Sequence, residues 1–203
     1  MPRMNLTTFL ANDAADSATK TSKILKYVDR PGGADYYWAL KSAAKKIFLE
    51  GEPYDQAVGV MANMTVDHQR LNNQQALKAA YDWKIQNPGE ALPPPSGSVS
   101  APKGELTIKL EPAWAIKRKG KFEAYVPWTF KNERLSRPTA GIGIWLLESG
   151  LQHDDYENWD FYLIDLVAKK RFGRSCITKS TALATMSALE AQENIYLNAR
   201  KSA

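Results

Sequence analysis

The sequence contains two clusters of positively charged residues that are suited to binding anions. The first cluster surrounds Gly120, and the second follows a β-prone stretch that begins at Phe161. Their members are Lys117, Arg118, Lys119 and Lys121 in the first, and Lys169, Lys170, Arg171, Arg174 and Lys179 in the second. Aromatic residues, Trp128 among them, flank the first cluster. Cations interleaved with aromatic rings are typical of surfaces that hold phosphates and stack bases.

The same pattern has a plainer explanation. Aromatic side chains on strands often belong to the core, and lysines often occupy solvated turns. The net charge of +5 favours an anionic partner, either nucleic acid or an acidic protein surface, but does not establish one.

The acidic segment His153–Asp160 is the best candidate for a cation site. It offers four carboxylates and an amide, and hard cations prefer several oxygen ligands. Its spacing does not match a calcium-binding EF-hand loop. We therefore interpret it as a solvated connecting loop that balances charge, with cation binding as the alternative, and we expect no metal and no cofactor.

No residue pattern identifies a catalytic centre. His68 and His153 are the only histidines and lie in different halves of the chain, and the sequence places no partner beside either one. Phosphate-binding loops, dinucleotide fingerprints and nucleophile elbows are absent from the sequence. The sequence therefore assigns no catalytic residue.

Cysteine usage and hydropathy predict a soluble cytoplasmic protein. Cys176 is the only cysteine, so an intramolecular disulfide is excluded and a reducing compartment is the natural interpretation. No apolar run reaches the roughly 18 residues that a membrane-spanning helix needs, and the N-terminus has no apolar region of the secretory kind. We therefore expect no membrane association.

The first half of the chain is predicted to be mainly helical. Residues 1–17 are polar and predict a loosely held arm. Apolar residues at helical spacing then predict helices over about 19–29, 36–48, 54–64 and 65–85. The Arg30–Gly33 segment predicts the end of the first of these helices, and Asp35 predicts the cap of the next.

The second half has the period of strands. Alternating apolar residues predict strands at 106–110, 114–116 and 122–130, with an exposed turn at 117–121, and a long strand at 161–172. Residues 135–151 fit a helix, because Ser136 and Pro138 resemble a helix start, but Gly141 and Gly143 favour a strand. We favour the helix. A last helix is expected over 180–200, with Met186 and Leu189 on its buried face.

From Val66 onward the expected order is helix, three strands, helix, strand, helix. This order resembles the core of the PD-(D/E)xK nuclease-like folds. The resemblance implies a divalent-metal site, with an acidic residue on the second strand and an E-x-K set on the third. Here the second strand reads Trp114-Ala-Ile-Lys117, without a carboxylate, and the third reads Glu123-Ala-Tyr125, without the lysine. The resemblance therefore implies a divergent or inactive relative.

The sequence as a whole predicts an α+β protein. We expect a helical region over 1–90, a proline-rich linker over 91–104, and a domain over 105–203 with a small antiparallel or mixed sheet and one or two packed helices. The favoured function is non-enzymatic binding of nucleic acid or an acidic protein by the basic and aromatic surface. One alternative is a nuclease-like protein that uses Glu123 and the acidic segment. Another is an adaptor that acts through the N-terminal helices, and the oligomeric state stays open.

Overall fold

The computed structural model describes residues 3–29, 36–130 and 134–202 and has an α+β fold. The helices are α1 (Leu6–Ala14), α2 (Ser17–Asp29), α3 (Trp38–Phe48), α4 (Tyr54–Ala57), α5 (Asp67–Gln86), α6 (Arg137–Leu151) and α7 (Thr181–Ser202). Single 3-10 turns are η1 (Val58–Met61), η2 (Asp154–Tyr156) and η3 (Arg174–Cys176). The strands are β1 (Arg3–Asn5), β2 (Glu90–Leu92), β3 (Gly97–Ser100), β4 (Thr107–Leu110), β5 (Trp114–Arg118), β6 (Lys121–Trp128), β7 (Trp159–Asp165) and β8 (Lys170–Phe172). The expected helix end at 30–33 and the expected cap at Asp35 lie outside the described residues.

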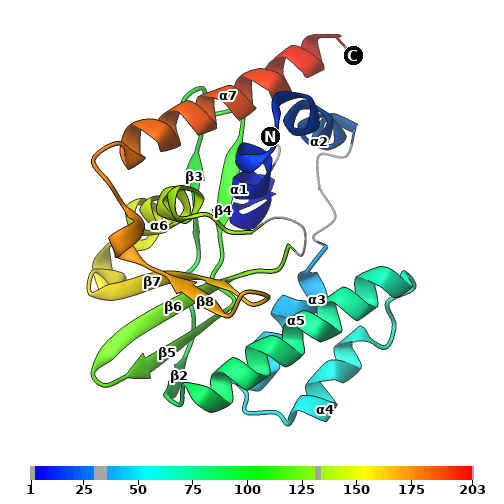
Figure 1. Cartoon of the computed structure of the whole chain (residues 1–203), viewed down its shortest axis with the longest axis vertical. Helices are drawn as coiled ribbons and strands as arrows, with labels where there is room; N and C mark the ends of the chain where they lie inside the picture. Colours follow the sequence, from blue (N-terminus) through cyan, green and yellow to red (C-terminus); the bar gives the residue numbers. More distant parts are fainter. Residues whose placement is uncertain (1–2, 30–35, 131–133, 203) are drawn as a thin grey trace.

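The strands form two mixed sheets (Figure 1). The larger has the order β2-β5-β6-β7-β8, in which β6 and β7 are parallel and every other pair is antiparallel. The parallel pair requires a crossover, and α6 supplies it. The smaller sheet has the order β1-β4-β3, with β1 parallel to β4.

Helices cover both faces of the five-stranded sheet. Successive side chains of a strand point to opposite faces, so Trp114, Ile116 and Tyr125 share one face, which packs on α3 and α5. Ala115, Ala124 and other residues of the opposite face join the core that contains α1, α6 and α7. In Figure 1, α3, α4 and α5 lie on one side of this sheet and α6 and α7 on the other. We call these the α5 face and the α6 face.

Residues 135–151 form a helix, as favoured above. Ser136 is the N-cap, and its Oγ accepts a hydrogen bond from the backbone N–H of Thr139 at 3.2 Å. Gly141 is explained by close packing, because a Cβ at that position would lie 2.5 Å from the backbone oxygen of Cys176. The two glycines that made the sequence resemble a strand therefore allow the helix to approach its neighbours.

Two expected elements were wrong. The N-terminal arm is not loosely held: β1 pairs with β4, and Phe9 and Leu10 are fully buried. The long strand expected over 161–172 is a hairpin, in which Asp165 Oδ1 accepts hydrogen bonds from the backbone N–H groups of Val167 and Ala168 and closes the turn between β7 and β8.

The proline-rich segment over 91–104 contains paired backbone. Leu92 ends β2, which pairs with β5, and Gly97–Ser100 is β3, which pairs with β4. Glu193 of α7 accepts hydrogen bonds from the backbone N–H groups of Lys103 and Glu105 at 2.9 and 2.7 Å. The segment is therefore held at both ends, and whether the parts that flank it fold as separate domains stays a prediction.

Candidate nucleic-acid interface

The β5–β6 turn carries the first basic cluster and has the backbone of a tight hairpin. Arg118 and Lys121 pair across the turn, and Lys119 and Gly120 between them have φ values of +50° and +78°. Two consecutive positive φ angles are characteristic of a type I′ turn, where Asn and Gly are the preferred residues. Among the described residues, the side chains of Lys119 and Lys121 make no ion pair or hydrogen bond, and both are exposed.

The cations of this turn divide between the two faces of the sheet. Lys117 and Phe122 lie on the α6 face, where the Lys117 Nζ lies 5.2 Å from the centre of the Phe122 ring. Arg118 and Lys121 lie on the α5 face. Lys119 occupies the tip between them.

Arg118 is fixed by a buried carboxylate. Its Nε and Nη2 donate to the two carboxylate oxygens of Glu123 at 3.1 and 3.2 Å, and its Nη1 donates to Asn87 at 2.8 Å. Tyr125 also donates its hydroxyl to Glu123, at 2.8 Å. A bidentate pair of this kind holds the guanidinium in one orientation.

Arg171 of β8 reaches the same carboxylate. Its Nη1 lies 3.6 Å from Glu123 and donates to the Tyr125 hydroxyl at 3.4 Å, and its guanidinium lies 4.4 Å from the centre of the Tyr162 ring. One cation from each basic cluster therefore converges on the α5 face. The sequence did not show this link, because Arg171 is distant along the chain from Glu123.

The tyrosines of this group are neutral hydrogen-bonding groups. Burial raises the pKa of Tyr125, and its hydrogen bond to Glu123 raises it further. Burial and the nearby carboxylate of Asp160 raise the pKa of Tyr162, against the opposing effect of Arg171. Both phenols therefore keep their protons at neutral pH.

The rest of the second cluster lies elsewhere. Because β6 and β7 are parallel, the β7–β8 turn with Lys169 and Lys170 lies at the opposite end of the sheet from the β5–β6 turn. Lys169 also has a positive φ, +53°. Arg174 is exposed and lies 3.8 Å from Glu148 of α6, and Lys179 is exposed before α7. The two clusters thus meet only through Arg118 and Arg171.

Trp128 is not available to a partner. Its side chain is 1% exposed and packs against Phe130 in the core on the α6 face. Phe122 and Tyr156, near the first cluster on the α6 face, are only half-buried.

The acidic segment forms the short turn η2. The carboxylates of Asp154, Asp155 and Glu157 are exposed, and His153 Nδ1 lies 3.0 Å from Asp154. Asp160 pairs in register with Glu123, but within the described parts of the chain no three His, Cys, Asp or Glu side chains are close enough to hold a metal ion. Cys176 is buried.

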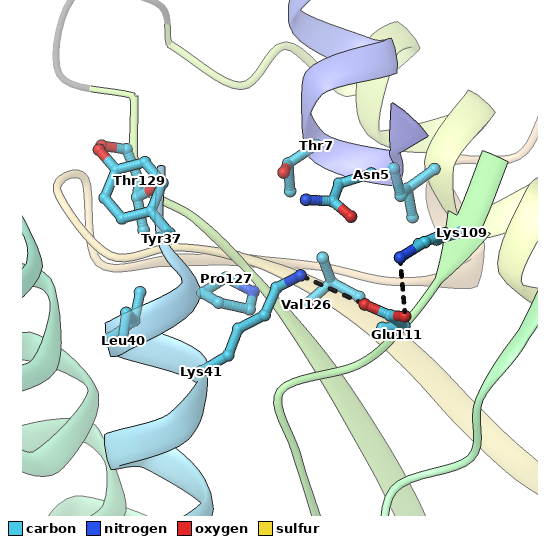
Figure 2. Close-up of a pocket in the computed structure, with 11 residues that line it drawn as sticks. Asn5, Thr7, Tyr37, Leu40, Lys41, Lys109, Glu111, Val126, Pro127 and Thr129 are labelled. Carbon is cyan, nitrogen blue, oxygen red and sulfur yellow. Dashed lines mark hydrogen bonds and ion pairs between the residues drawn. The ribbon is translucent and has the colours of Figure 1, made fainter. Parts of the chain in front are cut away.

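A pocket between α1, α3, β4 and β6 brings together residues that no sequence motif selects (Figure 2). Glu111 lies between two lysines, 3.4 Å from Lys41 and 4.0 Å from Lys109. At the other end Tyr37 donates its hydroxyl to the backbone oxygen of Thr129 at 3.0 Å. No short sequence pattern could reveal this pocket, because its residues come from elements that are far apart in the sequence, β1 among them.

The alternatives depend on other parts of the molecule. From α5 onward the order is α5, β2, β3, β4, β5, β6, α6, β7, β8 and α7. The nuclease resemblance rested on three strands before α6 and one after it, whereas the structure has five and two, and β4 lies in the other sheet from β5 and β6. Glu123, the candidate metal ligand, binds Arg118 and Tyr125. For an adaptor, exposed apolar side chains in the first half come from α2, α3 and α5 and the residue before α5: Leu25, Trp38, Val66, Leu71 and Ile85.

No described helix combines the length and the apolar character that crossing a membrane requires. No protein-family model matches the chain, and no curated protein matches it.

Proposed function

We propose that this protein is a non-enzymatic nucleic-acid-binding protein that holds phosphates at the β5–β6 turn. The observation that carries the proposal is Lys119, an exposed lysine at the tip of a type I′ turn with φ of +50°. A left-handed backbone costs a residue with a Cβ about 1 kcal/mol, and Gly or Asn would lower that cost.

Folding gives no reason for this lysine. Its side chain makes no ion pair within the described structure, and Lys117 and Lys121 add two further charges close by. Like charges so close repel one another. An anionic partner accounts for their presence, because each phosphate that a lysine neutralises releases a counterion and strengthens binding.

Nucleic acid fits this surface better than an acidic protein. The cations surround the tip on both faces, and Lys117 lies directly beside the partly exposed Phe122 ring. Cations that alternate with accessible aromatic rings match a strand that presents phosphates and bases in turn. On the α5 face, Glu123 fixes Arg118 and Arg171 in place, so that both guanidiniums are oriented before a ligand arrives.

The replacement Lys119→Asn tests the proposal. We expect it to weaken binding of labelled single-stranded DNA and RNA at low salt, and to leave the melting temperature unchanged or slightly raised, because Asn tolerates a positive φ. Binding is measured by fluorescence anisotropy and stability by thermal unfolding.

Lys169→Asn is the matched control, since it removes the same charge from a lysine with the same backbone conformation at the opposite end of the sheet. We expect it to keep most of the affinity. The proposal is wrong if the wild-type protein binds no nucleic acid at low salt, or if Lys119→Asn binds as tightly as the wild type.

A further inference from the structure

A pocket of about 320 Å³ opens beside the β5–β6 turn, on the α6 face of the sheet. Phe122, Tyr156 and Trp159 line it with aromatic rings, and Pro93 closes it from the side of β2. Asp155 and Asn158 supply its polar groups. Aromatic walls with a few polar groups, at this size, are typical of sites for small ligands or single ligand groups.

The three aromatic rings of this pocket contact one another, one pair stacked and one pair edge-to-face. Phe122 and Trp159 are neighbours across β6 and β7, with ring centres 5.6 Å apart and planes only 19° from parallel. Tyr156 meets Trp159 edge-on, at 5.2 Å and 79°. Trp159 is only 8% exposed and contacts both of the other rings. Phe122 and Tyr156 therefore present most of the accessible ring surface.

Charge is distributed unequally around the pocket. Lys117 lies against the Phe122 ring on this face, and Lys119 follows at the tip of the turn. The exposed carboxylate of Asp155 and the amide of Asn158 lie in the loop before β7, on the side of Tyr156. A ligand that spans this site therefore meets cations at one end and a hydrogen-bond acceptor at the other.

We infer that the pocket receives one unpaired base of a single-stranded nucleic acid while Lys117 and Lys119 of the β5–β6 turn hold the adjacent phosphates. This inference rests on the proposed function and adds to it the class of nucleic acid. A flat base matches the aromatic walls, and stacking of a base on such rings is a main source of single-strand affinity.

The polar groups suit an unpaired base without selecting one. The Asn158 side chain both donates and accepts hydrogen bonds, and the Asp155 carboxylate accepts them. Every base presents at least one N–H donor beside an acceptor on its pairing edge, thymine through its ring N–H and carbonyl oxygens. We therefore expect stacking on the rings, and not base identity, to set the affinity of the pocket.

The experiment removes one accessible ring of the pocket. Tyr156→Leu should weaken binding of a single-stranded oligonucleotide roughly tenfold at matched salt, because stacking of one base is lost. The slope of log affinity against log salt should stay unchanged, since no phosphate contact is removed. Tyr156→Phe keeps the ring and should keep the affinity, and Trp38→Leu, which removes an exposed ring of α3 outside the pocket, should bind as the wild type does.

These results separate the pocket from the proposed function. If Tyr156→Leu binds the single strand as tightly as the wild type, with the salt dependence expected of phosphate contacts, the pocket assignment is wrong and the proposed function stands. The same conclusion holds if Tyr156→Leu and Trp38→Leu weaken binding alike. If no oligonucleotide binds at low salt, the proposed function is wrong and the pocket assignment with it.

Discussion

The two glutamates Glu123 and Glu148 differ in the charges that surround them. Glu123 is 4% exposed and is surrounded by Arg118, Tyr125 and Arg171, so its charge is matched by donors. Glu148 of α6 is also largely buried, but its nearest cation is Arg174 at 3.8 Å. Burial raises the pKa of Glu148, and the nearby carboxylate of Asp160 acts in the same direction, while Arg174 opposes them.

This difference predicts a pH dependence for Glu148→Gln. The folded state raises the Glu148 pKa, so it binds this proton more tightly than the unfolded state does. The bound proton therefore stabilises the fold at low pH, and this stabilisation is lost as pH rises through the raised pKa. The glutamine variant should therefore be more stable than the wild type at neutral pH. The advantage should disappear toward about pH 4, where the carboxyl is protonated in the wild type as well.

Thermal unfolding over that pH range measures the effect, with Glu157→Gln as a control for the loss of one exposed carboxylate. An advantage of Glu148→Gln that stays constant from acid to neutral pH would contradict the assignment.

The sequence predicts the basic residues of the β5–β6 turn but not the side chains that they contact. It locates the turn at 117–121, and Gly120 there does have a positive φ. It also marks Glu123, but as a possible metal ligand of a nuclease-like site. The contact with Arg171 depends on strand order and on a long side chain that crosses β7 over Tyr162, and neither has a local signature in the sequence.

Among the elements, α6 depends on glycine for its position. A Cβ at Gly141 would lie 2.5 Å from a backbone oxygen, which cannot move without shifting η3. A Cβ at Gly143 would lie 2.7 Å from the end of the Leu163 side chain and 2.8 Å from that of Leu10, and both are flexible. The two positions therefore differ in what an added methyl group displaces.

We expect Gly141→Ala to destabilise the protein by about 1–3 kcal/mol, because the clash with backbone exceeds the gain in helix propensity of about 1 kcal/mol. Gly143→Ala should cost less, since leucine side chains can change rotamer. Chemical denaturation of both variants measures the difference. Equal effects, or a larger loss for Gly143→Ala, would show that α6 does not pack as described.

The elements also show where hydrophobic periodicity fails. It predicts α6 and α7 as helices, but it assigns Met186 to the buried face of α7, and that side chain is 44% exposed. The buried face of α7 is partly polar, because Gln192 donates to the backbone oxygen of Phe9 at 3.0 Å and Glu193 binds the segment before β4. A helix that satisfies backbone groups of other elements does not follow an apolar pattern.

The succession of segments with helical period and segments with strand period predicts the α+β class, and the structure has it. Composition also assigned residues 91–104 to a linker, although β2 and β3 lie in and beside that stretch and each joins a different sheet. Both strands are short and their partners come later in the chain, so only tertiary pairing defines them. For the same reason the sequence does not show that Arg118 and Arg171 converge on Glu123 on the α5 face.

Phosphate binding by the β5–β6 turn is tested by the salt dependence of nucleic-acid binding. Replacing Lys117, Lys119 and Lys121 with Gln removes three charges and leaves Arg118 paired with Glu123. The plot of log affinity against log salt for a single-stranded oligonucleotide should flatten by about 0.7 for each phosphate that the turn no longer neutralises. A control triple variant removes the same charge from exposed lysines of three helices: Lys26, Lys45 and Lys201. The control should keep the wild-type slope, and equal slopes for the wild type and the turn variant would contradict the claim.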